Sequence, residues 1–329
     1  MIIQVLLSSF NGGKYIRDQI DSILAQTQSG VKILVRDDGS TDCTKEILTE
    51  YMQKGILNWY EGKNVGPGNS FWNLLQDCDD ADYYAFCDQD DVWDSDKLKI
   101  AINMLENEKE NDSLPFYKND FNPGKLKSNT GKAEKVSKEV PLLYCCDVRV
   151  VDKDLRLVAD HMLVQIPTDY PHSLIRNIAP GCTYVFNQAA RTLLCRLDPE
   201  KHGIGLFDWT AYQIIACFGR VLFDPRSHMN YRQHGHNVIG AVTNIHRERL
   251  KKIKKFWSGD KKNSRQQNAL RLERVFGKNM TPANREITKA FAYYKTNPRY
   301  KCKLLMDRST YYPGPEYLLF KLLILFNRL

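Results

Sequence analysis

Apolar positions in the first part of the chain follow two different periods in turn. Residues 2–8 form a continuous apolar run, which is typical of a strand buried on both faces. Ile16, Ile20, Ile23 and Leu24 then recur at the spacing of one helical face. The pattern predicts a strand, a break at the intervening glycines, and a helix.

The same alternation continues to about residue 90. Strands are expected at 31–35, 56–60 and 83–87, with a helix near 70–75. The turn at 38–42 reads Asp-Gly-Ser-Thr-Asp and offers capping side chains to a further helix. Strands separated by helices imply a parallel sheet built from right-handed crossovers, so an α/β fold is predicted.

The pattern weakens over residues 109–140, which are rich in Asn, Gly and Lys. This composition predicts an insertion, either a disordered excursion or a functional lid. Ordered segments resume at 142–151 and 181–186, with helices after Asn187 and Phe207.

Charge divides the chain of 329 residues into two parts. Residues 245–329 contain 21 Lys and Arg against 6 Asp and Glu, whereas residues 1–244 contain 26 against 33. We therefore expect a domain over 1–244 and a basic, mostly helical extension over 245–329. A basic extension predicts contact with an anionic partner, either phospholipid or nucleic acid.

Sequence signals also bear on location. The chain begins without the basic region and cleavage site of a signal peptide, and the apolar segment 317–326 is too short to span a bilayer. That segment could lie in a membrane interface, or dock on the core or on a second subunit. Nine cysteines without a C-x-x-C pair indicate reduced thiols. We expect a cytoplasmic protein, with peripheral attachment to the inner face of the plasma membrane as an extension of that expectation.

Polar residues follow three of the predicted strands directly: 11–12, 37–39 and 88–91. In parallel sheets, ligands bind beyond the carboxyl ends of the strands, so these segments should converge on one site. Asp88, Asp90 and Asp91 repel one another unless something positive lies near them. Carboxylates at this spacing suit Mg²⁺ or Mn²⁺ together with phosphate oxygens, although solvated acids in a loop are an alternative.

At this point the sequence resembles the family 2 glycosyltransferases of the GT-A fold, a Rossmann-like, mostly parallel central sheet flanked by helices. The resemblance covers roughly residues 1–240, and the two segments CDQDDVW and YRQHGHN are most similar to those of bacterial rhamnosyltransferases. The motifs that carry it are, in order, Ser8-Ser9-Phe10-Asn11, Asp37-Asp38-Gly39-Ser40-Thr41-Asp42, Asn64-Val65-Gly66, Asp88-Gln89-Asp90-Asp91, Gly181-Cys182-Thr183, Phe207-Asp208-Trp209 and Tyr231-Arg232-Gln233-His234-Gly235-His236-Asn237.

The resemblance implies roles for the matching residues. Asp38 would bind the pyrimidine, Phe10 would line the base, Asp88 would contact the ribose and Asp90 would ligate the metal. The alternatives are helix capping by an Asx-turn for Asp38 and core packing for Phe10. The nucleotide-sugar-binding set is Ser8, Phe10, Asn11, Asp38, Asn64, Asp88 and Arg232.

Catalysis requires a base that takes the proton from the acceptor hydroxyl. The resemblance implies Asp208 for this role, with helix capping as the alternative. His234 would reach the metal or diphosphate, in competition with His236, and Arg232 could pair with phosphate oxygens. The residues assigned to the acceptor side or to support are Asp91, Gly181, Cys182 and Trp209.

The resemblance implies an inverting, metal-dependent transfer. Transfer of a single sugar is expected, because the Q-x-x-R-W motif and the transmembrane helices of processive members are absent. The first choice of donor is dTDP-L-rhamnose, with a UDP-sugar as the alternative. The expected acceptor is a lipid-linked saccharide or an oligosaccharide, in bacterial cell-surface polysaccharide synthesis.

Two other classes compete with a glycosyltransferase. A nucleotidyltransferase should carry a glycine-rich loop with several basic residues, and residues 8–14 contain a single lysine. A non-catalytic module could bind a nucleotide sugar or an anionic surface. Nucleic acid is not expected as a partner, because the body is acidic and no recognised nucleic-acid motif is present.

Overall fold

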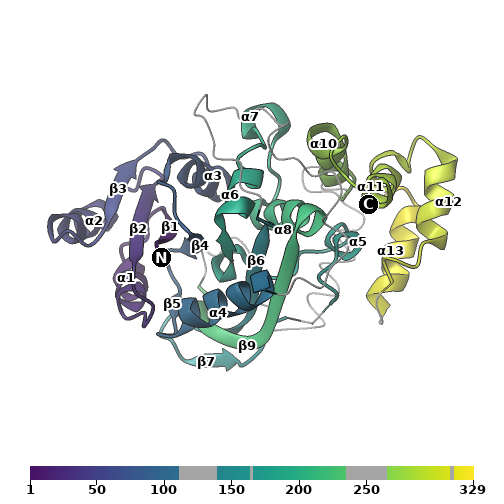
Figure 1. Cartoon of the computed structure of the whole chain (residues 1–329). Helices are drawn as coiled ribbons and strands as arrows, with labels where there is room; N and C mark the ends of the chain where they lie inside the picture. The colour runs from purple at the N-terminus through teal and green to yellow at the C-terminus, as the bar shows by residue number, and fades with distance from the viewer. Residues whose placement is uncertain (111–138, 164–165, 235–264, 312–314) are drawn as a thin grey trace.

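The computed structural model describes residues 1–110, 139–163, 166–234, 265–311 and 315–329 (Figure 1). Most of the predicted insertion at 109–140 lies outside the described residues. His236 and the first basic tracts of the extension lie outside them as well.

The first half of the sheet is parallel, as the apolar runs predict. β1 (Ile3–Ser9) pairs with β2 (Val31–Asp37) on one side and with β4 (Tyr83–Asp88) on the other. β3 (Asn58–Glu61) adds to β2, also in parallel. The apolar side chains of β1 and β4 are buried on both faces, as expected for strands inside a parallel sheet, whereas Trp59 and Tyr60 of the edge strand β3 are only half-buried.

The second half of the sheet is mixed. β8 (Val185–Asn187) is antiparallel to both β4 and β6 (Leu142–Val151), and β9 (Arg220–Arg232) then runs parallel to β6. β5 (Val92–Trp93) closes this edge as an antiparallel partner of β9. Within the described residues the order is β3-β2-β1-β4-β8-β6-β9-β5, with β7 (Leu157–Ala159) paired to β6.

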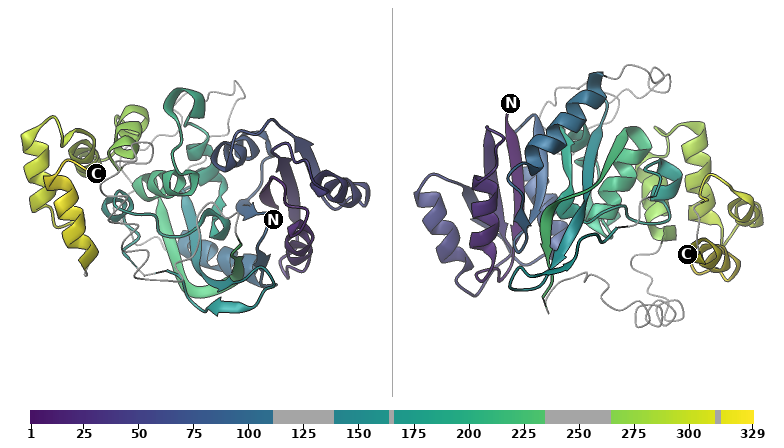
Figure 2. Two further views of the ribbon diagram at one scale, coloured as in Figure 1. Left: turned by 180° about the vertical axis from the view of Figure 1, so that it is seen from behind. Right: turned by 90° about the horizontal axis from the view of Figure 1, so that it is seen from below.

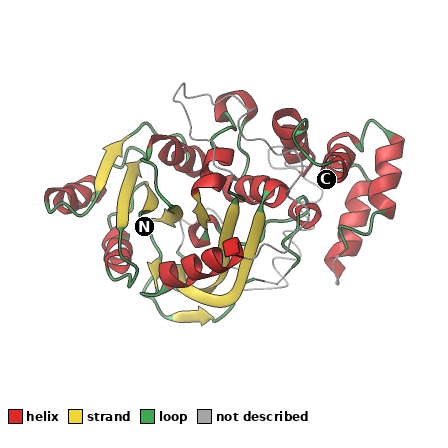
Figure 3. Ribbon diagram, in the orientation of Figure 1, coloured by secondary structure: helices red, strands yellow, loops and turns green. Residues whose placement is uncertain are grey.

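Helices cover both faces of the sheet (Figure 2). Val5 and Leu7 pack on one side with residues of α1 and α4, whereas Leu6 packs on the other side with α3 and α8. The α/β fold and the mostly parallel sheet flanked by helices are therefore confirmed (Figure 3). The helical elements of this body are α1 (Ile16–Leu24), α2 (Thr44–Gln53), α3 (Pro67–Asp77), α4 (Lys97–Glu110), α5 (Tyr170–Ser173), the 3₁₀ turn η3 (Gly181–Thr183), α6 (Gln188–Leu194), α7 (Pro199–His202) and α8 (Phe207–Phe218).

Four further helices follow: α10 (Arg265–Phe276), α11 (Pro282–Tyr293), α12 (Pro298–Met306) and α13 (Pro315–Leu325). Phe276 of α10 contacts Phe218 of α8 at 5.6 Å between ring centroids, and Asn284 of α11 donates to the Cys217 carbonyl at 3.2 Å. α10 and α11 thus share a core with the sheet domain, and α12 and α13 lie farther out (Figure 1). None of the helices in the described ranges is long and apolar enough to cross a bilayer.

Candidate functional site

The register of the parallel strands brings three loops together at one edge of the sheet. Ser9 at the end of β1 lies opposite Asp37 of β2, and Ser8 lies opposite Asp88 of β4. The loops that begin at residues 10, 38 and 89 consequently leave the sheet side by side. The convergence predicted from the sequence is present.

Asp37, rather than Asp38, forms the Asx-turn at the end of β2. Its carboxylate is buried and accepts hydrogen bonds from the backbone N–H groups of Gly39 at 3.2 Å and Ser40 at 2.8 Å. The Ser9 hydroxyl donates to the same carboxylate at 3.0 Å. This bonding fixes the turn, so the Asx-turn considered for Asp38 is formed by its neighbour. Neither residue caps α2, which begins at Thr44.

Asp38 is also buried, but it connects two loops. It forms an ion pair with Arg36 and accepts from the backbone N–H groups of Val65 and Gly66, both at 3.0 Å. Asn64 accepts from Gly66 at 3.2 Å in the same loop. The carboxylate proposed for base recognition is therefore held in place by its neighbours at the strand edge.

Phe10 lies at the surface of this edge, with 45% of its area exposed, so the alternative of core packing is wrong. Its backbone is fixed by Gln89, whose Oε1 accepts from the Phe10 N–H at 2.8 Å and whose Nε2 donates to the Phe10 carbonyl at 3.0 Å. An exposed ring on a fixed backbone can stack on a flat base. Gln89 lies within the acidic motif, but nothing in the motif indicated a separate role for it.

Asn11 and Ser8 bind neighbouring protein groups. Asn11 adopts φ of 49°, a left-handed conformation that Asn tolerates, and its Oδ1 accepts from the Thr41 N–H at 2.8 Å. The Ser8 hydroxyl donates to the Ser70 hydroxyl of α3 at 2.6 Å. Both residues therefore help to hold the loop that carries Phe10.

The acidic motif follows β4. Asp90 and His234 are in direct contact, with 2.7 Å between Oδ2 and Nε2, and both are partly accessible. Asp91 is buried, accepts from the Arg232 N–H at 3.0 Å and lies beside Cys182. Burial and the nearby charge of Asp90 raise the pKa of Asp91. Burial and the charges of Asp90 and Asp208 likewise raise the pKa of Asp88.

Arg232 helps to hold the acidic loop in place through its side chain. Its side chain is buried and donates to the carbonyl of Asp90 at 2.8 Å, to the carbonyl of Lys153 at 3.1 Å and to the carboxylate of Asp18 at 2.7 Å. The guanidinium also lies over the Tyr15 ring, at 4.7 Å from its centroid. These contacts are a structural role that the sequence did not indicate, and a contact with phosphate remains a proposal.

Lys97 is a buried residue whose positive charge acts on the carboxylates of the acidic motif. Its ammonium donates to the Cys182 carbonyl at 2.8 Å and lies 3.4 Å from the centroid of the Trp93 ring. Burial lowers its pKa, and the charge of Asp91 opposes that shift. A sequence signal was available, because Lys97 begins α4, where the helix dipole disfavours a positive charge.

Asp208 approaches the same edge from the first turn of α8. Its carboxylate accepts from the Asn177 side chain at 2.8 Å and from the Trp209 N–H at 2.7 Å, and burial raises its pKa. The N-cap residue of α8 is Leu206, so Asp208 does not occupy the capping position. A Cβ on Gly181 would lie only 3.1 Å from the Asp208 Cβ, which explains glycine there.

Cys182 and Trp209, assigned to support, are buried. The Trp209 indole donates to the Ser173 carbonyl at 2.6 Å, on the side of α8 that packs against α5. Cys182 lies with Asp88 and Asp91 in a group whose possible ligand atoms are all within 4.8 Å of one another. Sequence reasoning placed both residues near the site, and the structure puts them behind its surface.

The pH dependence of the reaction rate is expected to reflect the protonation of Asp208, the base that the sequence resemblance implies. A base must be deprotonated, so the rate should fall as the pH falls through its raised pKa. The hydrogen bond from Asn177 favours the charged form, so Asn177→Leu should move this acid limb to higher pH. We would measure kcat/KM against pH, with Asn103→Leu on the exposed side of α4 as control. Identical acid limbs in all three proteins would contradict the assignment.

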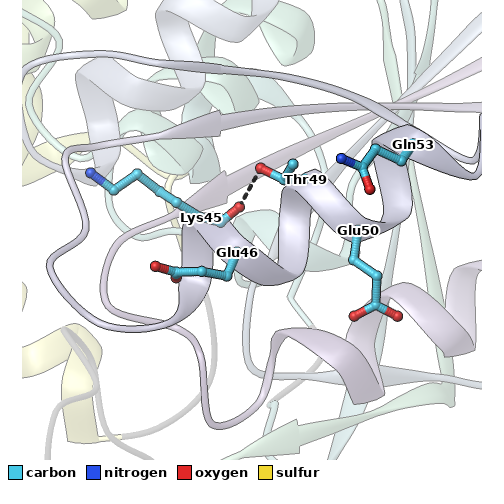
Figure 4. Close-up of a pocket in the computed structure, with 5 residues that line it drawn as sticks. All are labelled: Lys45, Glu46, Thr49, Glu50 and Gln53. Carbon is cyan, nitrogen blue, oxygen red and sulfur yellow. Dashed lines mark hydrogen bonds between the residues drawn. The ribbon is translucent and has the colours of Figure 1, made fainter.

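A separate open hollow lies along α2 (Figure 4). It is lined by Lys45, Glu46, Thr49, Glu50 and Gln53. Two of its charged residues have partners, since Glu50 pairs with Arg17 and Lys54, and Lys45 pairs with Glu61. None of the candidate site residues lines this hollow.

The fold is shared with known glycosyltransferases. Residues 1–349 of TarS from S. aureus superpose with a TM-score of 0.54 and 15% identity, over 94% of this chain and 76% of that one. The fold is therefore that of the GT-A glycosyltransferases.

Sequence comparison gives the family. The model of glycosyl transferase family 2 matches residues 4–147. The dTDP-rhamnosyl transferase RfbG of Shigella flexneri is 28% identical over 246 residues, 71% of this chain and 74% of that protein. A glycosyltransferase of Rickettsia prowazekii, RP339, is 26% identical over 78% of this chain and 71% of its own length. Residues 4–147 thus match glycosyl transferase family 2, and the chain is similar over most of its length to proteins named as glycosyltransferases.

Proposed function

We propose that this glycosyltransferase transfers a single L-rhamnosyl residue from dTDP-L-rhamnose to a saccharide acceptor, with inversion at the anomeric carbon. The main observation in support is that Asp208, from the second half of the chain, lies against Gly181, next to Cys182, whose sulfur is within 4.8 Å of carboxylate oxygens of Asp88 and Asp91. A candidate base thus lies at the donor-binding edge. The likeness to RfbG over most of the chain favours rhamnose as the sugar.

The donor would lie across the three loops at the strand edge. Phe10 offers an exposed ring to the base, Asp38 lies beneath the loop that begins at Asn64, and Asp88 can accept hydrogen bonds from ribose hydroxyls. Ser8 and Asn11 hold the surrounding turns. The structure of TarS has been determined with UDP-GlcNAc, so a UDP-sugar is the alternative donor to test.

The residues present fit a divalent cation. Asp90 and His234 already touch and are partly accessible, and Asp88 ends the strand that leads into the loop of Asp90. Carboxylate oxygens suit Mg²⁺ or Mn²⁺, and an imidazole can join them for Mn²⁺. A cation bound there would act as a Lewis acid and stabilise the departing diphosphate. We assign the ligand roles to Asp90 and His234.

The protein side of the transfer falls to Asp208. Its carboxylate would take the proton from the acceptor hydroxyl while that oxygen bonds to the sugar C1. The bond from C1 to the phosphate oxygen breaks, and its electron pair leaves with the nucleoside diphosphate. Asn177 donates to Oδ2 and the Trp209 N–H donates to Oδ1, so the carboxylate is held in one orientation. The displacement needs no covalent sugar intermediate.

The acceptor proposed is a lipid-linked saccharide or oligosaccharide of a bacterial surface polysaccharide, presented at the inner face of the plasma membrane. The basic extension supports this location, because residues 245–329 carry 21 Lys and Arg against 6 acids. The same charge also suits the rival proposal, a module that binds nucleotide sugars without catalysing transfer.

Release of nucleoside diphosphate from a panel of nucleotide sugars tests the proposal. The panel contains dTDP-L-rhamnose and several UDP-sugars, with Mn²⁺, Mg²⁺ or EDTA and with lipid-linked saccharide acceptors. We expect turnover of dTDP-L-rhamnose that EDTA abolishes and that Asp90→Ala lacks. Turnover of a UDP-sugar alone would transfer the proposal to that donor. Binding without turnover would favour the non-catalytic module.

A further inference from the structure

The last helix, α13, is apolar around most of its circumference, and only one side of it is covered by protein. Phe320 and Ile324 are buried, and the Phe320 ring stacks on Phe291 of α11 at 5.9 Å between centroids. These two residues fix the helix to the body of the molecule. A helix without a polar face normally has its whole surface covered.

The opposite side of α13 is bare among the described residues. Leu318 is 65% exposed and Phe326, just past the helix end, is 64% exposed. Exposed leucines continue the stripe between them at helical spacing, together with Met306 at the end of α12. The exposed apolar residues of this surface, which we call the α13 stripe, are Met306, Leu318, Leu319, Leu322, Leu325 and Phe326.

Basic groups border the α13 stripe. Lys301 of α12 donates to the carbonyl of Leu325 at 2.9 Å, and Lys321 donates to the carbonyl of Leu304 at 2.7 Å. Arg308 and Arg328 are exposed at the ends of the two helices. Residues 298–329 contain six Lys and Arg against two acids. Apolar side chains flanked by basic ones are typical of helices that lie in the interface of an anionic membrane.

Charge also separates the two candidate occupants. In a symmetric dimer through the α13 stripe, the same basic surface would face itself across the interface. Like charges brought together in this way oppose association, whereas anionic headgroups attract them. Figures 1 and 2 place α12 and α13 at the end of the molecule opposite α2, where a flat surface can reach them.

We propose that the α13 stripe docks on an anionic lipid surface, with α13 lying in the plane of the membrane. The proposal rests on the proposed function only for the role of the attachment, which would bring the donor site to lipid-linked acceptors. The physical argument depends on α12 and α13 alone.

Vesicle flotation of the full-length protein tests this directly. We expect binding to vesicles that contain phosphatidylglycerol, weak binding to pure phosphatidylcholine, and loss of binding as salt is raised. Leu322→Glu and Leu325→Glu should each weaken binding by about tenfold or more, because each replaces an apolar contact with a charge that anionic lipid repels. Leu157→Glu is the matched control, since Leu157 is a leucine on β7 that is more exposed than Leu322 or Leu325.

Three results would overturn the proposal. They are equal binding by Leu325→Glu and Leu157→Glu, equal binding to neutral and anionic vesicles, and a wild-type dimer that Leu322→Glu converts to a monomer without any vesicle binding. Light scattering supplies the last measurement, and circular dichroism shows that each variant is folded. Flotation needs neither donor nor acceptor, so its outcome is separate from the assay of transfer. A protein that floats but never turns over would refute the proposed function alone.

Discussion

Asp208→Asn is expected to lower kcat by about 10²- to 10⁴-fold, the usual contribution of a positioned general base. The amide keeps the shape of the carboxylate beside Asn177 and Gly181, so the fold should be preserved. It cannot accept the proton of the acceptor hydroxyl. Steady-state kinetics with the donor that turns over, at saturating acceptor, give the measurement.

Donor binding has to be measured beside this rate, because the Asp208 charge also acts on Asp88. We expect the Kd for the nucleoside diphosphate to change little in Asp208→Asn, while transfer is lost. Asp79→Asn is a suitable control, since Asp79 is exposed before β4, at the other end of that strand. A variant that keeps transfer within tenfold of the wild type would remove Asp208 from the role of base.

Lys97→Met is expected to destabilise the protein by about 1–3 kcal/mol, the usual cost of leaving a buried hydrogen-bonding group without its partner. The change leaves the Cys182 carbonyl without its donor and removes a buried positive charge that acts on Asp91. Without that charge the pKa of Asp91 should rise further. Urea unfolding followed by tryptophan fluorescence would give the free energy of unfolding.

Lys99→Met provides the comparison on the same helix. Lys99 is exposed, and its replacement should alter the free energy of unfolding by no more than about 0.5 kcal/mol. If both variants unfold at the same urea concentration, Lys97 does not balance the acidic motif. Loss of Mn²⁺ affinity in Lys97→Met alone, measured by titration, would show that the buried charge also supports the arrangement of Asp90.

The first half of the sheet could be predicted from sequence because its strands are parallel and its inner strands, β1 and β4, are buried on both faces. Their apolar runs end at polar turns, so both the strands and their shared edge can be recognised. β8 and β5 contain three and two residues, too few to show a period. β9 includes a Pro and a shift of register against β6, which hide its length of 13 residues. The mixed half therefore emerged only from the structure.

The site residues also fall into two groups: those whose location could be predicted from the sequence and those whose contacts could not. Phe10, Asp88 and Asp90 follow strands, and their common location could be predicted. Asp37 accepts the hydrogen bonds of the turn and Asp38 forms an ion pair, because their side chains point in different directions. Two adjacent, identical residues do not reveal this difference in the sequence. Asp208 meets Asn177 across 31 positions, and His234 meets Asp90 across 144. Contacts between such distant positions depend on packing, which periodicity does not record.

The pair of hydrogen bonds from Gln89 to the backbone of Phe10 has a thermodynamic consequence. One loop carries Asp90 and the other carries the exposed ring, and this clamp prevents either from moving alone. A cation that orders the first loop would also order the second. Cation and nucleoside would then bind cooperatively, and each would raise the affinity of the protein for the other by the same factor.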